Sequence, residues 1–360
     1  MEEVRDVVFV FGAGASYADG APLQAEILPI ILSDELADIK NSDTGKAVRK
    51  FIQDNFAWDN KARVYPSLES VFGFLDYFIN QDEHLSAAYP NRKIHALKEG
   101  LIKLLHFVIS EKASRRARVY RSFWETLFEH YRNVSILTLN YDTLLEEAFG
   151  VVCQEKYYID YDVHFMNDDL RQARTRVNPR EHLSEGTGGA RGKIKIMKAH
   201  GSLDWKYCHC CNQVLLIPGD TKIDLSCGVA THDYGHAAVG SGGNCCPVDG
   251  SELVTLIIPP SHVKRISHPV ISQILKESLR EVRSCKKIVF VGYSFPDADV
   301  HFKALFKKGL LNGQEIYVVN RTIEEKLRIN YQALSEGVNF IESSFENFIK
   351  KGFLVQRILQ

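Results

Sequence analysis

Residues 7–16 read VVFVFGAGAS, a run of large apolar side chains that ends in a glycine-rich turn. Five consecutive apolar residues suit a strand that is buried on both faces of a parallel sheet. The turn Gly12-Ala13-Gly14-Ala15-Ser16 leads into a segment that we expect to be helical. A strand, a glycine turn and a helix in this order are typical of the start of a nucleotide-binding, Rossmann-like α/β domain.

Five further apolar runs predict the other strands. They lie at residues 134–139, 193–199, 253–258, 287–292 and 315–320. The run at 193–199 alternates lysine with apolar residues, which predicts an edge or half-exposed strand. About 120 residues separate the first two runs. Because a βαβ crossover needs only roughly 30 residues, a further segment must be inserted there.

These patterns divide the chain into three parts. Residues 1–34, 131–204 and 253–360 are predicted to form the Rossmann-like domain. Residues 35–130 carry leucine and phenylalanine at helical spacing and predict a helical insertion. Residues 205–252 hold six of the eight cysteines and predict a small, zinc-ribbon-like module.

Composition excludes several classes of protein. The chain has 360 residues, of which 45% are hydrophobic and 25% charged, as in ordinary globular proteins. Its 44 basic and 45 acidic residues argue against nucleic-acid binding through bulk charge. No apolar run reaches the roughly 18 residues of a membrane helix, and the N-terminus lacks a signal-peptide pattern. We therefore expect a cytoplasmic protein whose cysteines are metal ligands or free thiols.

Polar or small residues follow several of the predicted strands, where ligands bind in open α/β sheets. These residues are Asn140, Asp142, His200, Gly292, Ser294 and Asn320. Each position has a structural alternative when it is read alone. Asp142 can simply cap the following helix, and the glycine turn can be a tight turn without a ligand.

The cysteine-rich segment predicts a metal site. Cys208 and Cys211 have the spacing of half a zinc ribbon. In the second half Cys246 is followed by Asp249 where a cysteine is expected. Since zinc also accepts carboxylate oxygens, we favour a structural zinc ion held by these four residues. The fourth ligand stays open, and the other candidates are Cys245, Cys210, Cys227, His209, His232 and His236. A ribbon without metal is the remaining alternative.

Taken in order, these motifs resemble those of the sirtuin family. Sirtuins carry a Gly-Ala-Gly turn, a Thr-x-Asn-x-Asp strand end, a His-Gly pair, a zinc ribbon, a Gly-Ser loop and a late strand that ends in asparagine. The matching segments here are Gly12-Ala13-Gly14, Thr138–Asp142, His200-Gly201, 208–249, Gly292–Ser294 and Asn320. The segment 35–130 carries none of them.

The resemblance implies NAD as the substrate. The main chain at Gly12, Ala13, Gly14, Ala15 and Ser16 would hold the pyrophosphate, and Gly292, Ser294 and Asn320 would bind the adenosine half. Asn140 would position the attacking water, Asp142 would orient the ribose or the nicotinamide, and His200 would act as a base on a ribose hydroxyl.

Two departures indicate the branch of the family. Protein-deacylating sirtuins follow the glycine turn with a segment like Ile-Pro-Asp-Phe-Arg, whereas this chain has Ala21-Pro22-Leu23-Gln24. The segments His200–Trp205 and Gly292–Asp297 are instead similar to sirtuin-like domains of bacterial anti-phage defence, which hydrolyse NAD. We therefore expect an NAD+ glycohydrolase. The alternatives are an NAD-dependent protein deacylase and a non-catalytic sensor of NAD or ADP-ribose.

Unrestrained hydrolysis of NAD would be toxic, so we expect control by assembly. Aromatic residues of the segment 35–130 predict a homo-oligomeric interface; they are Phe72, Phe74, Tyr77, Phe78, Trp124 and Phe128. The resemblance also implies a HerA-type hexameric ATPase as a partner.

Overall fold

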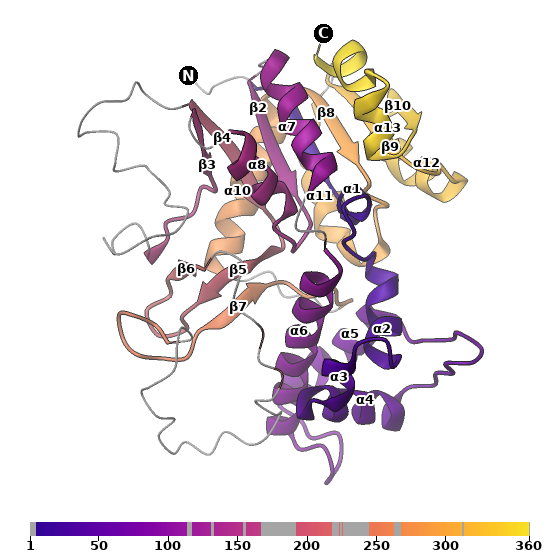
Figure 1. Ribbon diagram of the computed structural model, residues 1–360, viewed down its shortest axis with the longest axis vertical. Coiled ribbons are helices and arrows are strands. Elements are labelled where there is room, and N and C mark those ends of the chain that lie inside the picture. The colour runs from indigo at the N-terminus through magenta and orange to yellow at the C-terminus, as the bar shows by residue number, and fades with distance from the viewer. Residues whose placement is uncertain are drawn as a thin grey trace.

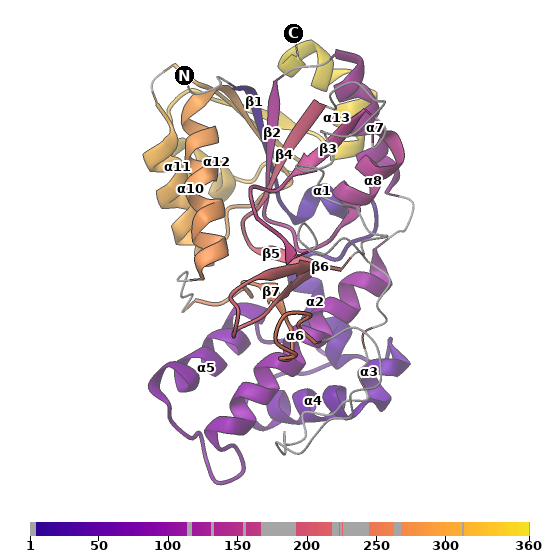
Figure 2. The same cartoon turned by 90° about the vertical axis from the view of Figure 1, so that its left-hand side faces the viewer.

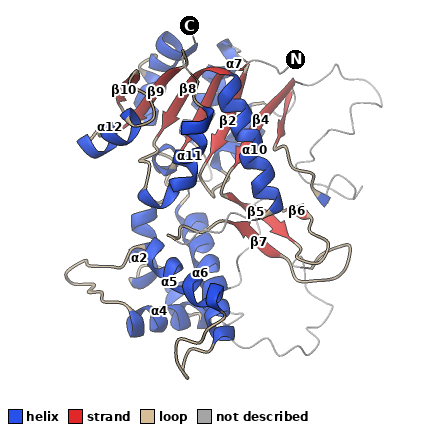
Figure 3. Cartoon of the chain, turned by 180° about the vertical axis from the view of Figure 1, so that it is seen from behind, coloured by secondary structure: helices blue, strands red, loops and turns tan. Residues whose placement is uncertain are grey.

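The computed structural model describes residues 5–113, 117–130, 133–153, 156–166, 192–217, 223, 225, 245–262, 268–311 and 313–359. A large sheet with its covering helices forms one end of the molecule, and a cluster of helices forms the other (Figure 1). A small sheet lies between them, as the view from behind in Figure 3 also shows.

The large sheet has seven strands in the order β10-β9-β8-β1-β2-β4-β3, and every neighbouring pair is parallel. The strands are β1 (Arg5–Phe11), β2 (Val134–Thr138), β3 (Tyr157–Asp160), β4 (Gly192–Lys198), β8 (Cys285–Val291), β9 (Glu315–Asn320) and β10 (Val338–Glu342). The apolar run of β1 is buried at the centre of the sheet, between β2 and β8. The predicted parallel α/β fold is confirmed. Strands β3 and β10 were not predicted.

Helices cover both faces of this sheet. One face carries α10 (Pro269–Ser284), α11 (Val300–Gly309) and α12 (Glu325–Gln332), and the other carries α7 (Arg118–His130), α8 (Leu144–Val152) and α13 (Phe345–Lys350) (Figure 2). The chain ends in a helical turn, η3 (Leu354–Leu359), which packs on α7 and α13. The crossover helices therefore bury both faces of the strands, as an all-parallel sheet requires.

Helix α7 belongs to the sheet, although its residues were predicted to lie in the helical insertion. The Phe123 ring meets the rings of Phe9 and Phe11 edge-on, with centroids 5.2 and 5.3 Å away. Trp124 is fully buried, and its indole N–H donates to the Leu145 carbonyl oxygen at 2.9 Å. These edge-on ring contacts hold α7 against the face of β1 from which Phe9 and Phe11 project.

The helical cluster also begins earlier than predicted. Its elements are α2 (Gln24–Leu32), α3 (Ala37–Asn41), α4 (Asp43–Asn55), α5 (Leu68–Gln81) and α6 (Asn91–Lys112). The apolar side of α2, including Ile27 and Ile31, is buried in the same core as Phe72 of α5 and Leu101 of α6. Packing therefore places this unit at about residues 24–112 rather than 35–130.

Most of the aromatic residues that predicted an oligomer interface are not available at the surface. Phe72 and Trp124 are fully buried, each in its own core. Phe74, Phe78 and Phe128 are half-buried against these cores, and only Tyr77 of the six is exposed. These five rings therefore pack against the interior of the chain and not at an exposed aromatic surface.

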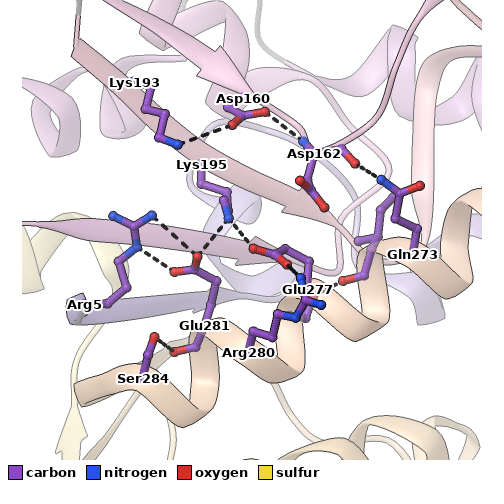
Figure 4. A network of polar contacts seen from close by, with 12 residues as sticks. Arg5, Asp160, Asp162, Lys193, Lys195, Gln273, Glu277, Arg280, Glu281 and Ser284 are labelled. Carbon is purple, nitrogen blue, oxygen red and sulfur yellow. Dashed lines mark hydrogen bonds and ion pairs between the residues drawn. The ribbon is translucent and has the colours of Figure 1, made fainter. Parts of the chain in front are cut away.

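Strand β4 lies between β2 and β3, so the prediction of an edge strand for 193–199 is wrong. Figure 4 shows why lysines can lie inside the sheet. The Lys195 ammonium group contacts Glu277 and lies 3.0 Å from Oε1 of Glu281. The other oxygen of Glu281, Oε2, accepts a hydrogen bond of 2.7 Å from Nε of Arg5. Burial alone would raise the pKa of Glu281, but the hydrogen bonds from Arg5 and Lys195 lower it. The network supplies the opposite charges that buried lysine requires.

The small sheet is antiparallel, with the order β6-β5-β7, and comprises β5 (Gly201–Tyr207), β6 (Val214–Leu216) and β7 (Val254–Ile257). The run at 253–258 therefore does not join the large sheet, as its assignment to the Rossmann-like domain implied. Gly201 makes the turn into β5 with φ +79°, and a Cβ there would lie 2.0 Å from the Leu256 carbonyl oxygen. Only glycine allows β5 and β7 to approach this closely.

Among the residues that the structure describes, no helix is both long and apolar enough to cross a bilayer.

We expect Lys195→Met to lower the free energy of unfolding by about 3 to 5 kcal/mol, because it leaves two buried carboxylates without their cation. Denaturant titration at neutral pH measures this loss. Lys193→Met is the matched control on the same strand: Lys193 is about half exposed, 4.0 Å from Asp160, and should change stability by no more than about 0.5 kcal/mol. Equal effects of both substitutions would contradict the role given to the buried network.

Candidate functional site

A cavity of about 1290 Å³ opens at the carboxyl ends of β1, β2, β8 and β9 and extends to the helical cluster. This is the point where the strand order reverses on either side of β1, the usual ligand position in such sheets. The predicted residues that line it are Gly12, Ala13, Gly14, Ser16, Asn140, Asp142, His200, Gly292, Ser294 and Asn320. Ala15 is the exception, because its side chain is fully buried in the sheet core.

The glycines of the site are needed where two strand-end turns touch. The short helix α1 (Ala13–Tyr17) follows β1, and its Gly14 N–H donates to the Gly292 carbonyl oxygen at 2.9 Å. A Cβ on Gly12 would lie 2.6 Å from that oxygen, and one on Gly292, which has φ +63°, would lie 2.2 Å from the Ala15 nitrogen. The N–H groups of Gly12 and Gly14 are used inside the protein, so phosphate contacts at this turn must come from its other groups.

The amide of Asn140 is held by the glycine turn. Its Nδ2 donates to the Gly12 carbonyl oxygen and to the Ser16 hydroxyl oxygen, both at 3.0 Å. The Ser16 hydroxyl is in turn 2.9 Å from the Tyr120 hydroxyl on α7. These bonds fix the amide plane, with its nitrogen toward the turn. Ser16 therefore acts through its buried side chain as well as through its main chain.

Asp142 combines the two roles that its sequence position allowed. Its Oδ1 accepts a hydrogen bond of 3.2 Å from the Leu144 N–H at the start of α8, yet it also lines the cavity. Beneath it, the Lys198 ammonium group donates to the Asp142 carbonyl oxygen at 2.6 Å and pairs with Glu146 at 2.7 Å. Burial raises the pKa of Asp142 to about 6, although the charge of Lys198 acts in the opposite direction.

His200 is buried, and its orientation is set by the main chain. Nδ1 lies 3.1 Å from the Leu139 carbonyl oxygen, and Nε2 lies 3.7 Å from Oδ1 of Asp299. The Tyr141 ring stacks on the imidazole at a centroid distance of 5.8 Å, and its hydroxyl donates to the Ile258 carbonyl oxygen at 2.7 Å. The ring orientation is therefore fixed, with Nε2 buried on the side of Asp299.

Asn320 and Ser294 complete the other end of the cavity. Asn320, the last residue of β9, donates through Nδ2 to the Tyr293 carbonyl oxygen at 3.2 Å. Ser294 is exposed and follows Gly292 in the same loop. Arg321, which comes next after Asn320, lies over the Tyr17 ring at 5.5 Å. This arrangement provides polar groups where a ribose and phosphates can bind.

Sequence reasoning missed Tyr141 and Asp299, which also line the cavity. Asp297, which ends the segment Gly292–Asp297, is exposed and pairs with Lys326 at 3.0 Å. Both aspartates lie in the turn η2 (Asp297–Asp299), where residues two apart project in different directions. The repeated acid in Pro-Asp-Ala-Asp was the available signal, but it does not say which carboxylate faces inward.

The four residues predicted to hold zinc lie together. The ligand atoms of Cys208, Cys211, Cys246 and Asp249 are all within 4.8 Å of one another. The sulfur atoms of Cys211 and Cys246 are 3.7 Å apart, and that of Cys208 is 3.3 Å from Oδ2 of Asp249. Three thiols and a carboxylate are an acceptable donor set for structural zinc. None of the four lines the cavity, so the group suits a structural role.

Comparison with known proteins agrees with this arrangement. Residues 134–341, more than half of the chain, match the model of a family described as SIR2-like domain. A search of curated proteins finds no match to the chain.

Several solved structures have a similar fold. A Sir2 homolog in complex with NAD is 15% identical, with a TM-score of 0.48 over 99% of this chain and 92% of that chain. A mutant Sir2 homologue in complex with 2′-O-acetyl ADP-ribose is 15% identical, with a TM-score of 0.48 over 97% of this chain and 90% of that one. A Sir2 protein bound to a propionylated peptide is 13% identical, with a TM-score of 0.47 and coverage of 98% and 93%.

We expect the purified protein to contain about one zinc ion per chain, and Cys246→Ser to lose the ion and to unfold at a lower temperature. Elemental analysis and thermal unfolding measure the two effects. Cys245→Ser is the matched control, because this neighbouring cysteine is exposed and outside the group. Loss of zinc from the Cys245 variant would show that the fourth ligand is wrong, and a metal-free parent of equal stability would show a ribbon without metal.

Replacement of Asp142 tests its environment. Because its pKa is raised from 3.8 to about 6, the folded state binds the proton more tightly than the unfolded state. Ionisation of Asp142 therefore lowers the free energy of unfolding as the pH rises from about 4 to about 6. Asp142→Asn should remove the loss, so its stability relative to the parent should increase by roughly 2.4 kcal/mol between pH 4 and pH 7. Denaturant unfolding at both pH values measures it, with Asp297→Asn as the exposed control. A difference that does not change with pH would contradict the raised value.

Proposed function

The chain belongs to the family of SIR2-like domains, and from this premise we propose that it is an NAD+ glycohydrolase. It cleaves the bond between nicotinamide and ribose and releases nicotinamide and ADP-ribose. NAD is its substrate, and zinc, where the cysteine group binds it, is structural.

The observation that carries the proposal is the cavity at the carboxyl ends of β1, β2, β8 and β9, where the strand order reverses. Every residue predicted to meet NAD, apart from Ala15, lines it. The volume of about 1290 Å³ exceeds the roughly 300–1000 Å³ of ordinary small-molecule pockets and leaves room for a dinucleotide.

The chemistry asks little of the protein beyond positioning and charge. Nicotinamide leaves as a neutral base, and the transition state resembles an oxocarbenium ion, as in glycoside cleavage. Asn140, with its amide plane fixed by the glycine turn, positions the attacking water. His200 accepts a proton from a ribose hydroxyl through Nε2, since Nδ1 is bonded to the main chain. Asp142 orients the ribose or the nicotinamide.

The wall beside the glycine turn favours hydrolysis over deacylation of proteins. Ala21, Pro22, Leu23 and Gln24 line the cavity at the place where deacylating sirtuins have an Asp-Phe-Arg segment. These side chains offer neither a carboxylate nor a guanidinium group. Protein deacylation and binding of NAD or ADP-ribose without catalysis stay as the alternatives.

The biological part of the proposal is anti-phage defence by depletion of NAD, restrained by assembly into a homo-oligomer and by a HerA-type hexameric ATPase. Its support is the sequence resemblance to defence domains and the toxicity of unrestrained NAD cleavage. Light scattering on the chain with and without such an ATPase tests the assembly. A monomer that cleaves NAD at the full rate would refute control by assembly and would leave the proposed NAD cleavage reaction unaffected.

We expect Asn140→Ala and His200→Ala each to lower NAD cleavage at least about 100-fold while the protein stays folded. Release of nicotinamide from NAD, followed by chromatography, measures the rate, and circular dichroism checks the fold. Asn339→Ala and His95→Ala are controls with the same chemistry at exposed positions outside the cavity, and they should keep the parent rate.

The same assay with an acetylated peptide separates the alternatives. Nicotinamide release that requires the peptide indicates deacylation, and NAD binding without release, with and without the ATPase, indicates a sensor. Parent-like rates in the Asn140 or His200 variant would refute the assigned roles.

A further inference from the structure

Asp299 is a carboxylate buried in the cavity wall, and none of the predicted motifs accounts for it. Its exposed fraction is 5%, and it ends the turn η2 just before α11. The Tyr293 hydroxyl donates to its Oδ2 at 3.0 Å, and its Oδ1 lies 3.7 Å from Nε2 of His200. The carboxylate therefore lies between a tyrosine hydroxyl and the ring of a histidine that lines the cavity.

The hydrogen bond at Nδ1 of His200 determines which protonation state of the ring the contact between Nε2 and Asp299 favours. A carbonyl oxygen can only accept, so the Leu139 contact assigns a proton to Nδ1 of His200. In the neutral ring, Nε2 then carries a lone pair beside the Asp299 carboxylate. When Nε2 gains a proton, the same contact becomes an ion pair. The arrangement therefore stabilises the protonated ring more than the neutral one.

We propose that Asp299 is a positioning residue for His200, and that it stabilises the imidazolium formed during the reaction. The proposal rests on the proposed function. The O–H bond of a ribose hydroxyl breaks, an N–H bond forms at Nε2, and the positive charge stays on the ring. Asp299 remains a carboxylate throughout, and its negative charge offsets the positive charge of the imidazolium.

Tyr293 and the glycine loop fix the carboxylate in this position. Tyr293 follows Gly292, whose carbonyl oxygen is bonded to Gly14, and its hydroxyl holds Oδ2 of Asp299. Oδ1 is then the oxygen that faces the imidazole. The contact between the Gly12–Gly14 turn and Gly292 therefore lies next to both residues: Asn140 is hydrogen-bonded to Gly12, and Tyr293, which holds Asp299, follows Gly292.

The other groups around the ring come from different elements. Tyr141 and His301, the latter on α11, each have a ring centroid 5.8 Å from that of His200, and Phe302 closes a further side at 5.0 Å. Within the part of the chain that the structure describes, Asp299, Tyr141 and His301 are titratable groups that face His200. A test that changes Asp299 alone leaves the other two in place.

The test compares Asp299→Asn with Asp297→Asn, the same change at an exposed position of the same turn. Two readouts are used: steady-state NAD cleavage, and ¹⁵N NMR of the His200 ring, assigned by its loss in His200→Ala. For Asp299→Asn we expect kcat to fall about 100-fold with KM within about threefold. The pH midpoint of the His200 signals should fall by about one unit. Asp297→Asn should match the parent in both.

Tyr293→Phe provides a second variant that keeps the carboxylate and removes its anchor. It should lower kcat and the pH midpoint of the His200 signals, each by less than Asp299→Asn does. If Asp299→Asn does not fold, Tyr293→Phe still tests the proposal. A kcat within about twofold of the parent, or an unmoved His200 midpoint, in the folded variant overturns the proposal. A parent that never cleaves NAD while the midpoint still shifts overturns the proposed function and leaves the pairing intact.

Discussion

Two strand-end turns touch backbone to backbone at the middle of the sheet, and the cavity depends on this contact. Gly12 and Gly14 after β1 meet Gly292 after β8 at distances that leave no room for a Cβ. Asn140 takes its orientation from the Gly12 carbonyl oxygen, and Tyr293 takes its place from Gly292. A side chain at any of these glycines would separate β1 from β8 where the ligand is expected to bind. The polar groups of the cavity therefore keep their positions because glycine, which has no side chain, occupies the points where the two turns touch.

Much of the fold and of the site could be read from local patterns. The run VVFVF predicts a strand buried on both faces, and β1 is such a strand at the centre of the sheet. Since the carboxyl ends of parallel strands share one edge, residues that follow different strands, such as Asn140 and Asn320, had to come together there. Ala15 could not be separated from its neighbours in this way, because the direction of one side chain in a short helical turn depends on packing.

The features that could not be predicted from the sequence depend on contacts between residues that lie far apart along the chain. The alternating lysines of β4 have the pattern of an edge strand, and their acidic partners lie far along the chain at Glu277, Glu281 and Glu146. The run at 253–258 has the composition of a parallel strand but pairs with β5, because Gly201 lets the two backbones meet. Helix α7 has the same apolar period as the helices before it, and only the position of Phe9 and Phe11 decides which core receives its aromatic rings. Asp299 escaped notice for a similar reason, since its meaning comes from His200, about 100 residues away.

Strand β5 begins directly after His200 and ends directly before Cys208. It pairs with β6 near Cys208 and with β7 at both of its ends, with an irregular register between Gly201 and Lys206. The cysteine group and the His200 imidazole are therefore joined by the seven residues of one strand, with no loop between them.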